Sequence, residues 1–177
     1  MFRTLTLMAA FAACLSAQAI APDTFKLNFV VPVGGDVLLT NAGTTAHHDL
    51  CADIYIFDPN QEMAECCSCE VTPNGLLATT VSDLINNNTL TGDTLSIALL
   101  KVVSSATTGS KGNICPNFVT PKPEPGIHGW TYLSNSQSDL QDAGLSAAEL
   151  AALTAECNAI KLVGSGKGVC QCPAALP

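Results

Sequence analysis

The chain has 177 residues, of which 15 are acidic and 7 are basic, and its formal net charge is −8. Arg3 is its only arginine, so the rest of the chain lacks the guanidinium group that proteins commonly use to bind phosphate and guanine. An acidic chain also repels nucleic acid at long range. The composition therefore excludes nucleic-acid binding.

The N-terminus has the three regions of an export signal. Arg3 supplies a basic start, Leu5 to Leu15 form an apolar core, and Ala17-Gln18-Ala19 has the small-x-small pattern of a cleavage site. We expect cleavage after Ala19, which makes residues 1–19 the signal peptide. A cut after Ala21 also fits the small residues, but it would leave a proline first in the mature chain.

A lipid-anchored start is the alternative to a plain signal peptide. The segment Phe11-Ala12-Ala13-Cys14 loosely resembles the bacterial lipobox, in which the cysteine becomes the acylated first residue. Phe11 stands where that motif usually has leucine, so we favour the plain signal. The apolar core is too short to span a bilayer, and no later stretch reaches the ~18 apolar residues of a membrane helix. We expect no transmembrane segment and a secreted, periplasmic or cell-envelope location.

The mature chain, residues 20–177, has the size of a single domain with one core. It retains 6 basic and 15 acidic residues, so its net charge is −9. Charged residues make up only 12% of the whole chain and apolar residues 47%. The chain is therefore apolar enough to fold, and much of its surface is neutral and polar.

Short strands separated by turns dominate the first hundred residues. Residues 25–31 alternate with period two and predict a strand whose Phe25, Leu27, Phe29 and Val31 face a core. Further strands are predicted over 36–40, 51–57 with Ala52, Ile54 and Ile56 on one face, 63–67, 76–81 and 94–103, the last clear strand. Gly, Pro and Asn turns lie between them, and no helical pattern does.

The second half of the chain predicts a loop and one helix. Residues 104–126 contain four prolines and are expected to be a surface connection held by Cys115. Ser146 and Glu149 have the spacing of a capping box that begins a helix over 146–160. Cys157 lies on its apolar face and is expected to point toward the strands. The fold class is an antiparallel β-sandwich, immunoglobulin-like and disulfide-stapled, with one C-terminal α-helix.

Cysteine is the most informative residue type. Eight of the nine cysteines follow Cys14, and this even number can pair completely, at positions Cys51, Cys66, Cys67, Cys69, Cys115, Cys157, Cys170 and Cys172. Closely spaced thiolates together with His47 and His48 are the alternative, as ligands of Cu(I) or Zn(II). The separated Cys-x-x-Cys pairs of a zinc ribbon are absent, and an oxidising compartment favours disulfides.

The cluster Cys66-Cys67-Ser68-Cys69 is expected to be a junction of several bridges. Adjacent Cys66 and Cys67 are too close to bond each other, because disulfides favour Cα separations of about 4.4–6.8 Å and neighbours lie about 3.8 Å apart. Eight cysteines allow 105 pairings, which the sequence does not distinguish. We expect at least one bridge from this cluster to the region after Cys115.

The remaining candidates for chemistry have stronger structural explanations. His47-His48-Asp49 fits a solvated loop, and His128 beside Gly129-Trp130 fits packing or a turn. No Gly-x-Ser-x-Gly elbow marks a nucleophile. Asp58, Asn60 and Glu62 alternate like calcium ligands, but Pro59 and a missing glycine favour a turn. No catalytic, cofactor or metal site is therefore predicted.

Sugar-binding proteins commonly expose several aromatic side chains. Apart from phenylalanine, this chain has only Tyr55, Trp130 and Tyr132. The sequence alone therefore does not support sugar binding.

Three segments resemble an uncharacterised family of small exported cysteine-rich bacterial proteins, of the kind found in acidobacteria. The similar segments are Leu50-Cys51-Ala52 with Ile54-Tyr55-Ile56-Phe57, Glu65-Cys66-Cys67-Ser68-Cys69 with Thr72-Pro73-Asn74-Gly75-Leu76, and Gly164-Ser165-Gly166 with Gly168-Val169-Cys170 and Cys172. The resemblance implies export and a stapled fold, and it implies no activity.

The expected function is that of a non-enzymatic secreted or cell-envelope binding or structural protein. Its partner would be a protein or a surface, or a second copy associated through exposed strand edges. A secreted hydrolase with an unmarked active site is the first alternative. A metal-binding or redox cysteine protein is the second, and it would require free thiols.

Overall fold

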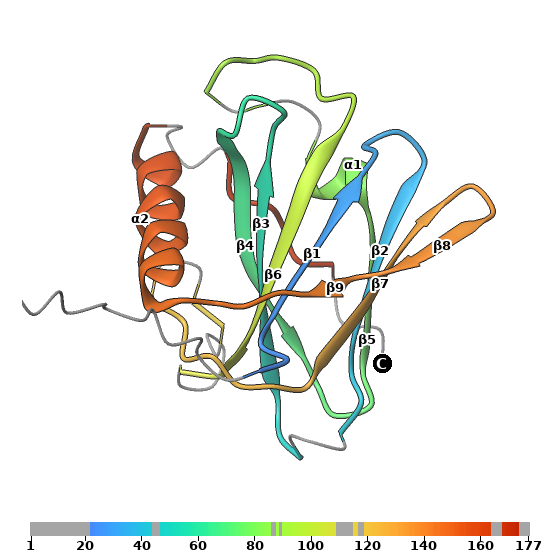
Figure 1. The fold of residues 1–177 in the computed structure, drawn as a ribbon, viewed down its shortest axis with the longest axis vertical. Helices are drawn as coiled ribbons and strands as arrows, with labels where there is room; N and C mark the ends of the chain where they lie inside the picture. The colour runs from blue at the N-terminus through green and yellow to red at the C-terminus, as the bar shows by residue number, and fades with distance from the viewer. Residues whose placement is uncertain are drawn as a thin grey trace, which may run out of the picture.

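Two antiparallel sheets and one long helix form three layers (Figure 1). The structure is a computed structural model, and it describes residues 22–43, 47–85, 88, 90–108, 115–116, 119–163 and 168–173. The expected signal peptide lies outside this part. No helix among the described residues is long and apolar enough to cross a membrane.

The strands and helices of the described chain have the following bounds: β1 Phe25–Val30, β2 Gly35–Asn41, β3 Leu50–Phe57, β4 Met63–Val71, β5 Leu76–Thr80, α1 Val81–Leu84, β6 Ala98–Ala106, β7 Ile127–Leu133, β8 Ser136–Asp139, β9 Gln141–Asp142 and α2 Ala147–Val163. The first sheet has the strand order β4-β3-β6-β1-β9, and the second has the order β5-β2-β7-β8. The mainly β, antiparallel class with one C-terminal helix is confirmed.

The main core lies between the two sheets. Ile54 and Ile56 of β3 meet Leu39 of β2 and Ile127 of β7, and all four side chains are fully buried. Ala52 belongs to the same cluster, so the prediction that residues 52, 54 and 56 share one face is confirmed. The whole of β3 is buried because its outer face is covered as well.

The helix α2 covers that outer face and forms the third layer (Figure 1). Leu150, Leu153 and Ile160 are buried in a second cluster against the strands. The amide of Glu149 donates to Ser146 Oγ at 3.1 Å, which is the first half of the expected capping box. The Glu149 carboxylate turns instead toward the sheet and accepts a hydrogen bond from Lys101 Nζ at 2.7 Å.

The two faces of β1 pack against different core clusters. Phe25 and Leu27 lie on the α2 side of the sheet, and Phe29 is 67% exposed. Val30 lies between the sheets. The prediction that Phe25, Leu27, Phe29 and Val31 face a core is therefore confirmed for Phe25 and Leu27, which pack in the cluster under α2, and wrong for Phe29. The alternation marks the side that the helix covers, because this sheet has apolar layers on both faces.

Three strands follow the long connection, where none was predicted. Trp130 and its neighbours lie in β7 rather than in a turn. The strand is hard to recognise because its inward positions carry Gly129 and Thr131 instead of large apolar residues. A Cβ at Gly129 would lie 2.6 Å from side-chain carbons of both Leu39 and Leu140, so only glycine leaves room for these leucines.

Other boundaries differ by a few residues. β4 continues to Val71, the end of the predicted 76–81 strand turns into α1, and β6 begins at Ala98 rather than at residue 94. Thr80 caps α1 by accepting from the amide of Asp83 at 3.0 Å. Within the predicted connection, the amide of Ala106 donates to Lys122 O, so its end pairs with β6.

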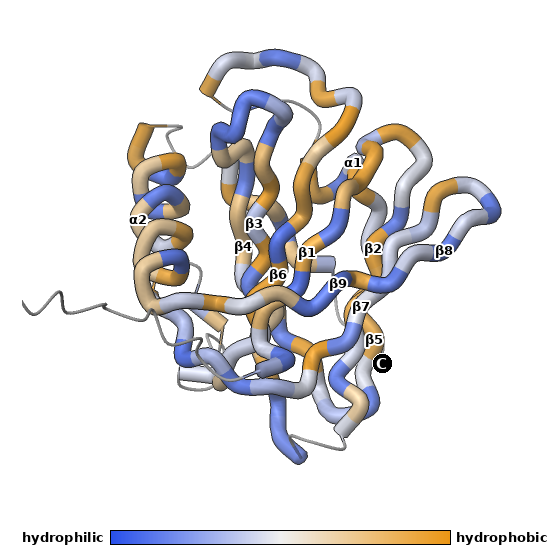
Figure 2. Tube along the Cα trace, in the orientation of Figure 1, coloured by the Kyte–Doolittle hydropathy of each residue, from blue (hydrophilic) through white to orange (hydrophobic). Residues whose placement is uncertain are grey.

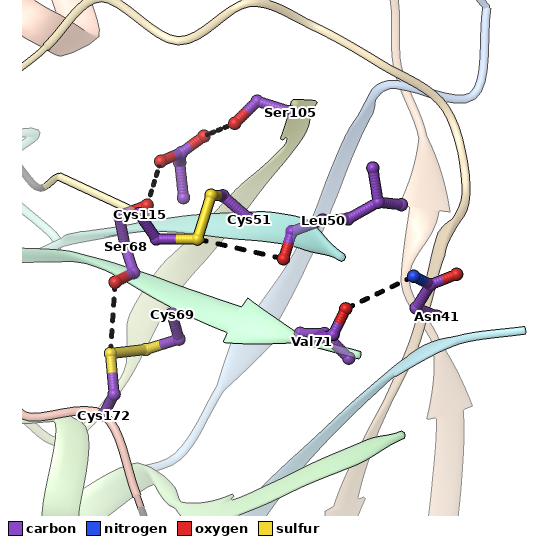
Figure 3. Close-up of a disulfide and its surroundings, with 10 residues drawn as sticks. Asn41, Leu50, Cys51, Ser68, Cys69, Val71, Ser105, Cys115 and Cys172 are labelled. Carbon is purple, nitrogen blue, oxygen red and sulfur yellow. Dashed lines mark hydrogen bonds between the residues drawn. A yellow bond between two sulfur atoms is a disulfide. The ribbon is translucent and has the colours of Figure 1, made fainter. Parts of the chain in front are cut away.

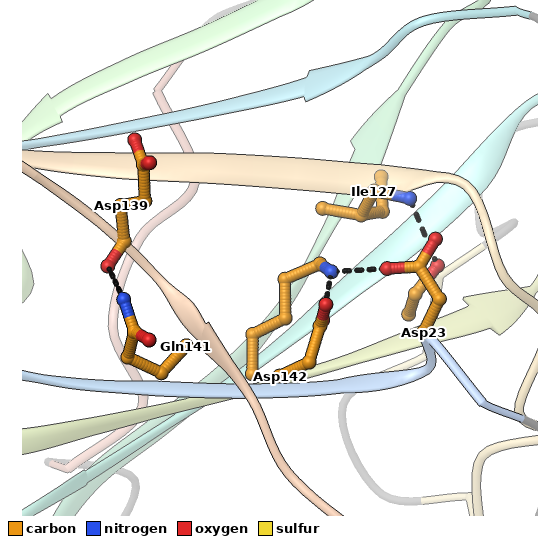
Figure 4. A network of polar contacts seen from close by, with 7 residues as sticks. Asp23, Ile127, Asp139, Gln141 and Asp142 are labelled. Atoms are coloured by element: carbon orange, nitrogen blue, oxygen red, sulfur yellow. Dashed lines mark hydrogen bonds and ion pairs between the residues drawn. The ribbon is translucent and has the colours of Figure 1, made fainter.

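A buried lysine closes the edge of the first sheet. Lys26 is 4% exposed, and its Nζ lies between the carboxylates of Asp23 and Asp142 (Figure 4). Burial by itself lowers the pKa of Lys26, but the hydrogen bonds to Asp142 and Asp23 outweigh burial and raise it. The charged pair joins β1 to β9, the short strand that enters from the second sheet.

Candidate functional site

Strand β4 carries one half of three disulfides. They join Cys66 to Cys157, Cys67 to Cys170 and Cys69 to Cys172, and the fourth joins Cys51 to Cys115. Their Cα atoms lie 5.2–5.8 Å apart, within the usual range for a disulfide. The expectation that at least one bridge joins the cluster to the region after Cys115 is confirmed, because three bridges do so.

The alternation of a strand explains why neighbouring cysteines reach different partners. Successive side chains point to opposite faces, so Cys66 meets α2 while Cys67 and Cys69 point to the other face. There the C-terminal segment runs beside β4, with the Cys66 amide donating to Gly168 O and the Cys170 amide donating to Cys66 O. The helix and this segment are both tied to one edge strand.

Three sulfur atoms are close enough together to suggest a metal site. The sulfur atoms of Cys67, Cys69 and Cys172 lie within 4.8 Å of one another. Each is bonded in a disulfide, whereas a metal requires the thiolate. The cluster therefore has the chemistry of a cross-link in this state.

A carboxyl group is buried beside these bridges. Asp53 Oδ1 accepts a hydrogen bond from Ser68 Oγ at 2.5 Å, and Oδ2 accepts one from Ser105 Oγ at 2.5 Å (Figure 3). Asp53 is 6% exposed. Burial raises its pKa to about 6, although the hydrogen bonds from Ser105 and Ser68 act in the opposite direction.

The sequence gives only a weak indication that the carboxyl group of Asp53 is buried. Asp53 interrupts an otherwise apolar strand, but it alternates with the core-facing residues and was not singled out. Pro116, Val119 and Pro121 line a cavity of about 10 Å³ beside it, which has room for about one water molecule. The Cys51–Cys115 disulfide lies at this cavity (Figure 3).

The histidines considered as ligands or bases lie in separate places. His47 and His48 are exposed, as expected of a solvated loop, and His48 Nε2 lies 3.0 Å from Glu124 Oε1. His128 lies in β7, on the outer face of the second sheet. None of the described histidines lies beside Asp53 and its two serine partners.

The turn after β3 is a structural element, as predicted. Asp58 Oδ1 accepts from the amides of Asn60 at 2.8 Å and Glu62 at 2.9 Å. Asp58 Oδ2 accepts from Asn88 Nδ2 at 2.9 Å. The turn is hydrophilic along its length (Figure 2). Asp58 Oδ1 closes the turn, and Oδ2 connects it to Asn88.

The outer face of the second sheet carries a row of aromatic side chains. His128, Trp130 and Tyr132 occupy every second position of β7, and all three are partly exposed. We call these three residues the aromatic row. The long helix lies on the other sheet, away from this face (Figure 1). The sequence pattern missed the row because β7 itself was missed.

Polar groups flank the aromatic row on both sides. Asp36 of β2 lies opposite Tyr132, and Asp139 of β8 lies opposite Trp130. Tyr132 OH donates to Gln137 Oε1 at 2.6 Å, which holds the phenol ring against β8. The face therefore combines ring surfaces with hydrogen-bonding groups beside them.

Two hollows meet at one end of the sandwich. One of about 270 Å³ lies between β1 and the β7–β8 hairpin, and one of about 300 Å³ lies beside the β3–β4 turn. Phe29 lines both of them. Their walls are largely apolar, and neither contains a described histidine or cysteine.

Comparisons of the chain with protein-family models, with curated proteins and with solved structures find no match.

The first prediction concerns the bridge between β4 and α2. Replacing Cys66 and Cys157 together by alanine removes a cross-link that spans 91 positions. We expect the free energy of unfolding, measured with guanidinium chloride, to fall by about 2–4 kcal/mol. We also expect the amides of α2 to exchange hydrogen faster, because the helix loses its covalent tie.

The matched control is the double variant Cys51→Ala and Cys115→Ala, whose bridge spans 64 positions and does not touch α2. It should lose a similar amount of stability while the α2 amides keep their protection. Equal protection of α2 in the two double variants would contradict the proposed role of the Cys66–Cys157 bridge.

The second prediction concerns pH. The pKa of Asp53 rises from 3.8 to about 6 on folding, so between these values the folded protein binds the proton more tightly than the unfolded chain. The contribution of Asp53 to stability should therefore fall by about 3 kcal/mol as the pH rises from about 4 to about 6, and then level off. Chemical denaturation at a series of pH values measures this, and Asp53→Asn should remove the decline.

Glu65 provides the control for this pH series. Burial raises its pKa from 4.5 to about 7, so Glu65→Gln should remove the part of the decline that continues above pH 6 and leave the Asp53 contribution, which ends near pH 6. A pH profile for Asp53→Asn that matches that of the unsubstituted protein would refute the assignment.

Proposed function

We propose that this chain is an exported, non-enzymatic binding or structural protein of the extracellular space or the cell envelope. The observation that carries the proposal is the set of three disulfides on β4, which cross-link the sandwich to its helix and C-terminal segment. Disulfides persist in oxidising compartments, where a cross-linked domain resists unfolding.

The polar groups of the described residues favour binding over catalysis. Ser68 and Ser105 donate to a buried acid, but they have no histidine beside them to act as a base. His48 pairs with Glu124 on the surface, and His128 lies on another sheet. The parts of a Ser-His-acid hydrolase are therefore in different places.

Self-association through a strand edge is a second part of the proposal. The edge of the first sheet at β4 is partly covered by the C-terminal segment, whereas β8 forms an edge of the second sheet and all four of its residues are exposed. Its sequence, Ser-Gln-Ser-Asp, lacks the lysine or proline that commonly protects an edge. Asp139 O already accepts from the side chains of Asn28 and Gln141, so a second copy pairing along β8 would bond to the outward backbone groups of Gln137.

The binding role is tested with the oxidised mature protein and a cell-envelope fraction from the organism that makes it. We expect saturable retention, because the folded domain presents fixed surfaces. The control is the same protein after reduction and alkylation, which lacks the folded surfaces and should not be retained. Absence of retention, or equal retention of the folded and alkylated forms, would contradict a binding role.

Self-association is tested by size-exclusion chromatography with light scattering. We expect the molar mass to rise with protein concentration. Leu133 and Ser136 close the hairpin, so hydrogen bonding should alternate along it and the Gln137 amide should point away from β7. Gln137→Pro removes that outward donor and should keep the protein monomeric. A strict monomer at all concentrations would contradict assembly.

A further inference from the structure

The aromatic row lies in the middle of an open sheet face. β7 runs between β2 and β8, so His128, Trp130 and Tyr132 form a central line with a strand beside it. Same-face positions of a strand lie about 6.7 Å apart, which spaces neighbouring rings by roughly the width of a sugar ring. Three rings in line form a platform rather than a pocket.

Three residues of β2 lie beside the aromatic row. The β2 residues opposite the row are Thr40 beside His128, Leu38 beside Trp130 and Asp36 beside Tyr132. Ala78 of β5 follows outward from Leu38. These neighbours leave Trp130 and Tyr132 partly exposed.

The groups at the sides of the platform accept and donate hydrogen bonds. The carboxylates of Asp36 and Asp139 are acceptors on opposite sides of the row. Gln137 uses its oxygen for Tyr132 OH, which leaves its amide N–H groups as donors. The tyrosine bond also fixes the ring before any ligand arrives, which lowers the ordering cost of binding.

The charge on this face selects against anionic ligands. The described lysines lie on or beside the first sheet or on α2: Lys26, Lys101, Lys122 and Lys161. The mature chain has no arginine. A phosphate, sulfate or carboxylate on the ligand would therefore approach two aspartates without a described lysine or arginine to offset them.

We infer that the aromatic row binds a neutral polysaccharide, with pyranose rings stacked on Trp130 and Tyr132. A pyranose ring has an apolar C–H face, which stacking buries against the aromatic ring, and hydroxyls at its rim. Those hydroxyls would donate to Asp36 and Asp139 and accept from Gln137. This inference rests on the proposed binding function and names its ligand class.

A cationic peptide is the competing ligand, because the two aspartates would also attract it. The platform favours the sugar for a geometric reason. Peptide side chains anchor in concave pockets. The hollow of about 270 Å³ reaches Tyr132 and Asp36 at one end of the row, but neither of the two larger hollows is lined by Trp130 or His128. A ring that stacks needs only a flat partner.

The chain carries its own reporter for the test. Trp130 is the only tryptophan, so its fluorescence reports on this face alone. The oxidised mature protein is titrated with cellohexaose, xylohexaose and mannohexaose, and with polygalacturonate and a lysine-rich peptide as competing ligand classes. We expect a saturable blue shift with at least one neutral hexasaccharide and none with polygalacturonate.

Substitutions separate stacking from general effects. Tyr132→Ala should weaken hexasaccharide binding about tenfold, which corresponds to the loss of one aromatic contact. Leu162→Ala removes an exposed apolar side chain on α2, away from this face, and should leave the affinity unchanged. Trp130→Ala removes the reporter, so its retardation is measured in native gels that contain the corresponding polysaccharide. Circular dichroism of each variant verifies that it is folded.

Each outcome decides the matter. No shift with any neutral hexasaccharide, binding to the lysine-rich peptide alone, or equal weakening by Leu162→Ala would overturn the glycan assignment. If the folded protein is nevertheless retained by the cell-envelope fraction, the binding function stands and only its ligand class falls. If it is not retained either, both proposals fall.

Discussion

The structure depends on the covalent attachment of two distant segments to one edge strand. β4 alternates its cysteines, so Cys66 holds α2 on one side while Cys67 and Cys69 hold the C-terminal segment on the other. A shift of one residue in the pairing of β3 with β4 would send every cysteine to the wrong face. The bridges therefore fix the strand register as well as the positions of helix and terminus.

The buried polar groups of the first sheet are compensated by polar side chains beside them. Asp53 and Lys26 are almost fully buried, and removing charged groups from water costs several kcal/mol per ion. Asp53 has two serine hydroxyls, and Lys26 has two carboxylates, which offset part of that cost. The first sheet thus holds its polar groups inside, covered by helix and loop, while the second sheet leaves its aromatic and acidic groups on an open face.

The parts predictable from the sequence are those whose signal is local. Eight cysteines, the apolar run of β3 and the cap at Ser146 lead directly to bridges, a central strand and a helix. β7 was missed because its inward positions hold Gly129, where Leu39 and Leu140 already fill the space, and its large rings point outward. The sequence did not show which core Phe25 and Leu27 face, since no local pattern distinguishes a sheet with two apolar faces from a sheet with one. The aromatic row required the pairing of β7 with β2 and β8, which only the tertiary structure supplies.

Peptide mapping of the native protein without reduction tests the central claim most directly. The account predicts four linked peptide pairs, joining Cys51 to Cys115, Cys66 to Cys157, Cys67 to Cys170 and Cys69 to Cys172, and no alkylated cysteine among these eight. Linked pairs confined to β3 and β4, or free thiols in the β4 cluster, would contradict it.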